Sequence, residues 1–117
     1  MADLRRPGIR AGALLLMLAT SGCSVMDSNA VGTLIYHTTE GRVLQIDSPP
    51  VDGCHRLAPS GAKYIANNTL NDLILYTGPD CRSLADTETF YLATQMSDPG
   101  VPGQVPWRSF TVVGGNA

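Results

Sequence analysis

The stretch Thr33-Leu-Ile-Tyr-His-Thr-Thr-Glu-Gly-Arg-Val-Leu-Gln-Ile46 decides the fold class of this chain. Its two ends, residues 33–37 and 42–46, are rich in the residue types that favour strands. Residues 38–41 lie between them and include Gly41, which accepts turn conformations that other residues avoid. The pattern therefore predicts a β-hairpin of two antiparallel strands.

Further short segments of the same kind follow the hairpin. Pro49-Pro50 predicts a loop directly after it, because proline cannot donate a hydrogen bond within a sheet. The asparagine-rich segment 67–72 predicts a turn, and residues 97–106, with three prolines and two glycines, predict the longest loop without secondary structure. No window has helical periodicity over 11 residues. We therefore expect a small all-β Greek-key sandwich or barrel of about six strands, the other four being 62–66, 73–76, 90–95 and 109–113.

The composition allows one small globular domain and excludes several classes of protein. A chain of 117 residues is long enough for one domain and not for two. Its apolar fraction of 44% is too high for a disordered chain. The formal net charge of −2, from 8 basic and 10 acidic side chains, argues against nucleic-acid binding, which requires a basic face.

Residues 1–22 have the composition of an export signal. Three arginines precede an uncharged apolar run over residues 11–19, and three small residues follow at 20–22. The run has about half of the roughly 20 residues that a membrane-spanning helix needs. This pattern predicts a signal peptide with a short signal helix, and a buried N-terminal helix is the alternative. Arg5-Arg6 also resembles a twin-arginine signal, which leaves the export route open.

Gly22-Cys23 resembles the lipobox of bacterial lipoproteins, in which a cysteine follows a small residue. The resemblance implies cleavage between Gly22 and Cys23, lipidation of the Cys23 sulfur, and an anchor on the extracytoplasmic face of the cell membrane. Residues 23–30 would then form the lipidated N-terminus and tether, and residues 31–117 a single β domain. Plain secretion is the alternative. Without residues 1–22 the chain has 5 basic and 9 acidic side chains, so attachment would depend on acyl chains and not on anionic lipid.

The two remaining cysteines, Cys54 and Cys81, form an even pair in an exported chain, which predicts a disulfide. A disulfide closing this 28-residue loop would stabilise the domain. The chain-entropy argument puts that contribution at about 3.5 kcal/mol. A metal site using Cys54, His55 and Cys81 is an alternative that lacks the ligand spacing of zinc sites, and a catalytic thiol is another.

Four segments of the domain together carry a family resemblance: Ala62-Lys-Tyr-Ile-Ala-Asn67, Leu73-Ile-Leu-Tyr76, Asp80-Cys81 and Arg108-Ser-Phe-Thr-Val112. They resemble small secreted actinobacterial proteins of βγ-crystallin-like type. The resemblance implies Greek keys in which a strand carrying an aromatic residue precedes a fold-over marked by Cys or Gly. Some members of that family inhibit metalloproteases. The family's calcium signature is absent here, because the threonine of Asn67-Asn68-Thr69 comes too early, so no cofactor is expected.

The titratable residues do not form a recognisable catalytic set. An enzyme needs a nucleophile, a base and a group that orients the base. His37 is expected on the surface at a strand edge, and His55 beside the disulfide. The acidic residues are expected in turns, at a strand start or capping backbone N–H groups of a loop: Glu40, Glu88, Asp80 and Asp86.

Trp107-Arg108 is the candidate binding feature, because Trp and Arg are typical interface anchors. The pair follows loop 98–106, whose prolines limit the entropy lost on binding. One interpretation is a recognition loop presenting Pro102, Val105 and Pro106. The other is that Trp107 fills the base of the sandwich while Arg108 pairs with an acid.

These observations predict a membrane-anchored, non-enzymatic binding or envelope-interaction module with a protein partner and no nucleic acid. A protease inhibitor using loop 98–106 is the alternative, and a hydrolase is a third possibility. The classes differ in geometry: an inhibitor should expose that loop with Trp107 buried behind it, whereas an enzyme should gather His37 or His55 with a carboxylate in a pocket.

Overall fold

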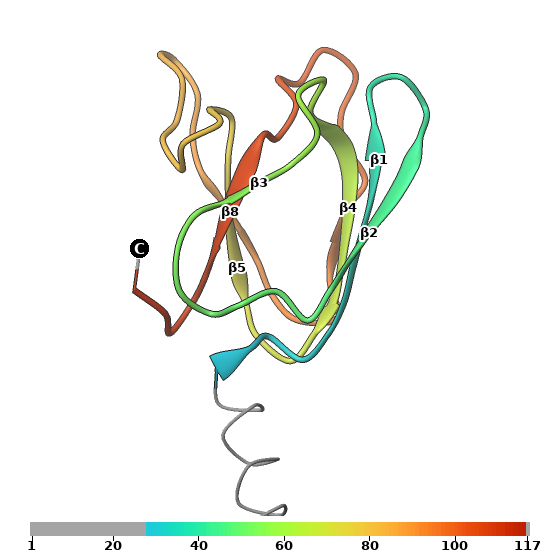
Figure 1. Cartoon of the computed structure of the whole chain (residues 1–117). Helices are drawn as coiled ribbons and strands as arrows, with labels where there is room; N and C mark the ends of the chain where they lie inside the picture. The colour runs from blue at the N-terminus through green and yellow to red at the C-terminus, as the bar shows by residue number, and fades with distance from the viewer. Residues whose placement is uncertain (1–27, 117) are drawn as a thin grey trace, which may run out of the picture.

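The computed structural model describes residues 28–116, which form two four-stranded antiparallel sheets packed face to face (Figure 1). The fold is therefore the all-β sandwich that the sequence predicts. The first sheet has the order β2-β1-β4-β7 and the second β3-β8-β5-β6. The strands are β1 Gly32–Thr38, β2 Val43–Asp47, β3 His55–Arg56, β4 Ala62–Thr69, β5 Leu73–Tyr76, β6 Phe90–Leu92, β7 Ser97–Asp98 and β8 Ser109–Val112.

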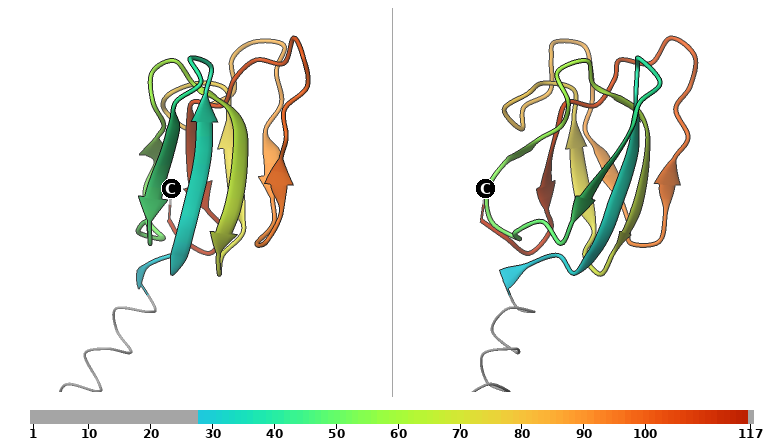
Figure 2. Two further views of the ribbon diagram at one scale, coloured as in Figure 1. Left: turned by 90° about the vertical axis from the view of Figure 1, so that its right-hand side faces the viewer. Right: turned by 45° about the vertical axis from the view of Figure 1, so that its right-hand side comes forward.

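The strand order contains two Greek keys that exchange strands between the sheets. In the first, β4 returns to lie beside β1 while β3 crosses to the second sheet. In the second, β8 returns beside β5 while β7 crosses to the first sheet. The two views of Figure 2 show the resulting layers, with β7 beside β4 at one side of the sandwich. Each Greek key contributes strands to both sheets, so each sheet is complete only when both Greek keys are present.

The two Greek keys share the local structure of one turn, at an offset of 40 residues. In the first turn the N–H of Thr38 bonds the Arg42 carbonyl at 2.8 Å, and in the second the N–H of Gly78 bonds the Arg82 carbonyl at 2.9 Å. The fold-over residues of these turns, Gly41 and Cys81, both have positive φ, 88° and 55°. The similarity is confined to the turns, because the strands before them are out of phase at this offset: Leu34 is buried and Ile74 is not.

Alternating apolar side chains of both sheets form the core. Along β1 and β5 every second side chain points inward, as expected for strands buried on one face. Phe110 on β8 is the largest of the fully buried side chains among the described residues. The other fully buried apolar side chains of this volume class are Leu34, Ile65, Leu73, Leu75 and Leu92.

Strand β4 continues three residues beyond the predicted end at residue 66, because Asn67 belongs to the core and not to a turn. Its side chain is completely buried. Nδ2 donates to the carbonyls of Asn71 (2.9 Å) and Leu92 (3.2 Å), and Oδ1 accepts from the N–H (3.1 Å) and hydroxyl (2.7 Å) of Thr69. With its donors and acceptors satisfied, the amide can be buried at little cost.

Two additional strands, a shorter strand and the lengths of the loops also differ from the sequence prediction. The longest connection between strands in residues 28–116 is 77–89, between β5 and β6, and not the segment 97–106. β3 and β7 contain two residues each and bring the total to eight among the described residues. β7 lies inside the segment expected to lack secondary structure, where Ser97 and Asp98 pair with Ala66 and Ile65. A strand of two residues is too short to show an alternation of apolar and polar residues. Such a strand can be recognised only from the strand with which it pairs. The predicted strand 90–95 ends at Leu92, and Gln95 turns with φ 66°.

The disulfide between Cys54 and Cys81 is present, with a Cα–Cα distance of 5.8 Å. It takes up both thiols that a metal site or a catalytic thiol at these positions would need. Ser109 supports the same fold-over: its hydroxyl donates to the Gly78 carbonyl at 2.6 Å and accepts from the Cys81 N–H at 2.9 Å. The fold-over is therefore held to both neighbours, β3 through the disulfide and β8 through Ser109.

The described chain enters the sandwich at Ser28. Ala30 is fully buried and its N–H bonds the Pro49 carbonyl at 2.7 Å, while Asn29 forms a bridge with Pro50. The last three residues of the expected tether thus contact the first loop of the domain. The predicted signal peptide, its cleavage site at Gly22 and the lipidated Cys23 lie outside the described residues.

Candidate functional site

Loop 98–106 lies at the end of the sandwich opposite Ser28. In Figures 1 and 2 the blue start of the described chain is at the bottom, and the orange-to-red loop between β7 and β8 is at the top. The β1–β2 turn and the long β5–β6 connection reach the same end. A partner approaching this end would meet loops and not sheet faces.

Backbone pairing holds both ends of this loop against β4. Before the loop, Asp98 pairs with Ile65. After it, Trp107 and Ala62 form a bridge with two reciprocal hydrogen bonds of 2.7 and 2.9 Å. The chain therefore leaves β4 and returns to the same strand, which fixes the loop at its base.

A buried hydrogen bond between side chains joins the two ends of the loop. Trp107 is 5% exposed and Asp98 8% exposed. The indole Nε1–H donates to Asp98 Oδ2 at 2.6 Å. Asp98 Oδ1 also accepts from the N–H of Gly100 at 3.2 Å, as in an Asx-type turn. Because a hydrogen bond to a charged acceptor is stronger than a neutral one, this contact is the main polar restraint on the loop.

Two glycines allow the loop to approach β4 closely. A Cβ on Gly100, where φ is +75°, would lie 2.1 Å from the carbonyl oxygen of Lys63. A Cβ on Gly61, where φ is +84°, would lie 2.7 Å from the Pro106 side chain. Both positions need glycine for conformation and for space. The loop is thus packed on β4 at two separate points.

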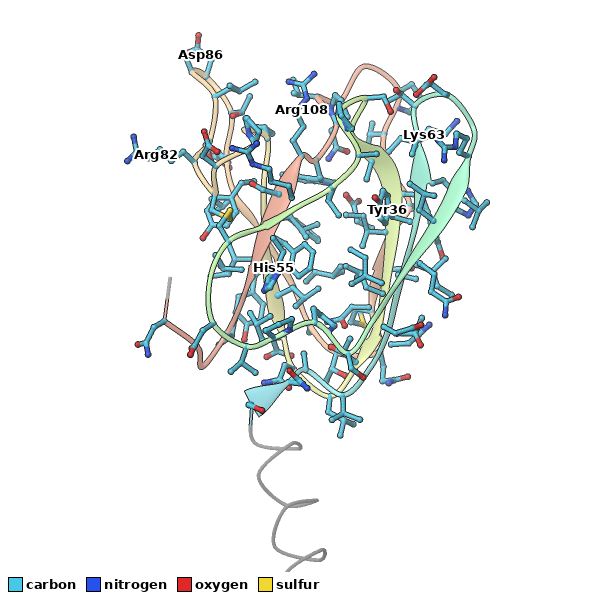
Figure 3. The ribbon with its side chains drawn as sticks, in the orientation of Figure 1. Tyr36, His55, Lys63, Arg82, Asp86 and Arg108 are labelled. Carbon is cyan, nitrogen blue, oxygen red and sulfur yellow. A yellow bond between two sulfur atoms is a disulfide. The ribbon has the colours of Figure 1, made fainter. Side chains whose placement is uncertain are left out.

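A groove of about 510 Å³ separates the remainder of the loop from the outer face of the first sheet. His37 and Tyr64 come from the sheet, with ring centroids 4.8 Å apart. Lys63 lines the same groove and is exposed. Figure 3 labels it at the upper right of the sandwich. The loop contributes Val101, 67% exposed, and Val105, 38% exposed.

The predicted site residues divide into three places. Pro102, Val105 and Pro106 line the groove, whereas Trp107 lies beneath the loop in the core. Arg108 lies on the other side of the loop base, where it lines a second depression. The structure therefore brings the loop residues together and separates Arg108 from them. Within residues 28–116 no acidic side chain lies within ion-pair distance of Arg108, so the expected acid partner is not there.

The two histidines occupy different environments. His37 lies on β1, which is flanked by β2 and β4, so its expected place at a sheet edge is wrong. No carboxylate is among the residues that line its groove. His55 stacks on Phe110 with ring centroids 4.9 Å apart, and its Nε2 lies 2.8 Å from the Pro50 carbonyl oxygen. Each imidazole is therefore placed by packing contacts.

The acidic residues near this end also differ from expectation in part. Asp80 forms an ion pair with Arg56 and bonds no loop N–H among the described residues. Glu40 lies in the β1–β2 turn and is exposed, as expected. Across residues 28–116, no three metal-ligating side chains gather at one point. In the same range no helical segment has the length and apolar character of a membrane span.

Asp72 and Tyr91, whose pKa values are shifted, lie at the Ser28 end of the sandwich. The Tyr91 hydroxyl donates to Asp72, and the N–H of Thr94 adds a bond of 2.8 Å. These bonds, the one from Tyr91 first, lower the pKa of Asp72 below its usual value. The same contact with Asp72 raises the pKa of Tyr91. The pair therefore stabilises the β4–β5 turn in its ionised-carboxylate form.

No family model, curated protein or solved structure compared with the chain matches it. The site must therefore be interpreted from its own residues. The sequence did not identify Lys63 or Asp98 as site residues, although Asp98 begins the candidate loop. An aspartate nine residues before a tryptophan carries no signal until the pairing of both segments with β4 brings the two side chains together.

Proposed function

We propose that this chain is an exported, lipid-anchored and non-enzymatic binding module that contacts a protein partner through loop 98–106. The observation that carries the proposal is the loop itself. Its exposed apolar side chains, Val101 and Val105, are held over the buried Asp98–Trp107 hydrogen bond. A loop restrained before binding loses less conformational entropy when a partner engages it.

The arrangement of the domain supports a role facing away from a membrane. The predicted lipid acceptor, Cys23, precedes Ser28 by five residues. Loop 98–106 lies at the opposite end of the sandwich (Figure 1). An anchor at Cys23 would therefore leave the loop pointing toward the extracytoplasmic space.

The double Greek key supports the βγ-crystallin-like interpretation of the domain. Cys81, which marks the fold-over in the resemblance, has positive φ, and so does Gly41 in the corresponding turn of the other half. Since one fold carries many functions, this agreement concerns architecture, and the binding role rests on the loop.

The anchor is tested by mass spectrometry of the protein extracted from membranes of an expressing bacterium. We expect the N-terminal peptide to begin at Cys23 and to carry acyl chains. Ser24→Ala should keep this modification, and Cys23→Ala should lose it together with the membrane association. An unmodified Cys23 in wild-type protein would refute the anchor and favour plain secretion.

The binding surface is tested by a photo-crosslinking amino acid placed at Val101, with Leu70 as the matched control. Both side chains are apolar and about equally exposed, at 67% and 69%. Leu70 lies at the Ser28 end, where its N–H bonds the Val31 carbonyl at 2.9 Å. We expect a discrete crosslinked protein from position 101 and none from position 70. Equal crosslinking from both positions would contradict the proposal.

A protease inhibitor is the second candidate, because the loop is exposed and Trp107 is buried behind it, as an inhibitor requires. Its test uses a metalloprotease such as thermolysin as probe. Inhibition by the wild-type chain should be lost in Val101→Asp and kept in Leu70→Asp. Rapid cleavage within residues 98–106 without inhibition would remove this candidate.

A further inference from the structure

A second depression, of about 320 Å³, opens beside the loop base where β3 and β5 diverge from β8. Two arginines line it together with small or apolar residues. The backbone of Arg108 lies between the two diverging segments: its carbonyl accepts from Leu57 N–H at 2.9 Å, and its N–H donates to the Tyr76 carbonyl at 2.8 Å. The lining residues are Arg56, Leu57, Ala58, Pro59, Pro79 and Arg108.

The walls of this depression are fixed before any ligand arrives. Pro59 and Pro79 stand on segments that other contacts hold. The N–H of Ala58 bonds the buried Tyr36 hydroxyl at 3.1 Å. The disulfide ties the segment before β3 to the fold-over that follows Pro79. Because restrained walls need no ordering on binding, the depression is suited to a small, specific group.

The charges of the depression sum to one uncompensated cation. Arg56 is neutralised by its ion pair with Asp80. Arg108 has no acidic partner among the described residues, and no carboxylate lines the depression. Figure 3 shows Arg108 at the upper end of the sandwich, where a ligand can reach its side chain. One free guanidinium matches a monoanion, and its planar fork matches a carboxylate.

We propose that this depression binds the carboxyl terminus of a polypeptide that ends in an aliphatic residue. In such a residue the carboxylate and the apolar side chain share one Cα, so both fit a depression of this size. The carboxylate would meet Arg108, and the side chain would contact Leu57 and the two prolines. An internal Asp or Glu supplies the charge without the apolar group beside it. The depression is separate from the groove under loop 98–106, so either proposal can fail without the other.

The test is an NMR titration of the ¹⁵N-labelled protein with N-acetyl-leucine, observed at the Arg108 Nε–H and at the backbone amides of residues 56–58. We expect saturable shifts confined to the depression. N-acetyl-leucinamide, which lacks the charge, and acetate, which lacks the side chain, should each cause much smaller shifts. Inorganic phosphate tests whether charge alone suffices, and phosphate shifts as large as those of N-acetyl-leucine would overturn the proposal.

Variants assign the effect to Arg108. Arg108→Gln should weaken N-acetyl-leucine binding by roughly tenfold to a hundredfold, the effect expected for losing hydrogen bonds to a charged group. Arg108→Lys should recover part of the affinity, because it keeps the charge and loses the fork. Arg82→Gln is the matched control, since Arg82 is exposed nearby and does not line the depression. Unchanged amide spectra outside the depression show that each variant is folded, and wild-type affinity in folded Arg108→Gln would refute the assignment.

Discussion

Replacing Trp107 by phenylalanine removes the Nε1–H that joins the two ends of loop 98–106 and keeps an aromatic ring in the core. The ring is 5% exposed and the bond to Asp98 Oδ2 measures 2.6 Å. After the substitution the buried carboxylate retains the N–H of Gly100 at 3.2 Å and the more distant Gln104 amide at 3.5 Å. It loses its shortest donor in a place that water reaches poorly.

The expected cost follows from the type of bond and its burial. A hydrogen bond to a charged group contributes about 1.5–3 kcal/mol. The smaller ring adds about 1 kcal/mol of lost packing, at the lower end of large-to-small core substitutions. We therefore expect the free energy of unfolding to fall by about 3 kcal/mol, which for a domain of this size corresponds to roughly 10–20 °C in Tm. A domain of this length has about 5–13 kcal/mol in total, so the variant stays folded at room temperature.

Urea unfolding followed by circular dichroism measures this change, with Tyr76→Phe as the matched control. Tyr76 also loses one hydrogen-bonding hydroxyl, which lies 3.1 Å from Thr111 Oγ1, but that bond is neutral and part-buried. We expect about 1 kcal/mol or less for the control. A double-mutant cycle with Asp98→Asn isolates the coupling between the two loop ends.

The reasoning would be refuted if Trp107→Phe cost no more than Tyr76→Phe, or if the cycle with Asp98→Asn gave no coupling. Either result would mean that strand pairing with β4 alone holds the loop. The crosslinking at Val101 would then have to be explained by a mobile loop, because the restraint proposed for it would be absent.

Three further predictions concern other restraints. The disulfide joins residues separated by 27 positions. Its reduction should add 2 Da to the mass and lower the free energy of unfolding by about 3.5 kcal/mol, measured with and without reductant. Equal stability of the two forms would contradict the chain-entropy argument. Gly100→Ala should displace the loop and speed its proteolysis, because its Cβ would meet the Lys63 carbonyl at 2.1 Å, whereas Gly103→Ala, which has a similar positive φ (+86°) but open space around it, should speed cleavage much less. The hydrogen bond from Tyr91 lowers the pKa of Asp72 below 3.8. The stabilisation of the folded state by this bond should therefore be present above pH 3.8 and be lost as the pH falls through the folded-state pKa of Asp72. Asp72→Asn should therefore differ from wild type near neutral pH and converge with it in acid.

The fold class could be predicted because strand and turn patterns depend on residues that are neighbours in the sequence. The hairpin at 33–46 was predicted from strand-forming residues around Gly41, and the structure places β1 and β2 there with Ile35 opposite Gln45. The disulfide followed from the even cysteine pair. The two-residue strands β3 and β7 could not be predicted, since a pairing of this length is stable only on a partner strand that is already in place.

The candidate site was predicted in composition but not in arrangement. One interpretation joined loop 98–106 and Trp107-Arg108 into a recognition feature, and the other placed Trp107 in the core with Arg108 paired to an acid. The structure confirms Trp107 in the core, and it places the loop at a groove and Arg108 at a separate depression without an acid partner among the described residues. Successive residues of an extended chain point to opposite sides, which separates Trp107 from Arg108.

The sequence by itself determined an all-β domain, its disulfide, the proline- and glycine-rich loop at 98–106 and the prediction of an exported, anchored chain. These depend on residue type and on spacing along the chain. Only the tertiary structure decided that Asp98 meets Trp107, that Asn67 is a core residue, and that Arg108 faces a depression without an acid partner. Each of these depends on which strands become neighbours in the two Greek keys, and that choice comes from packing two sheets around one core.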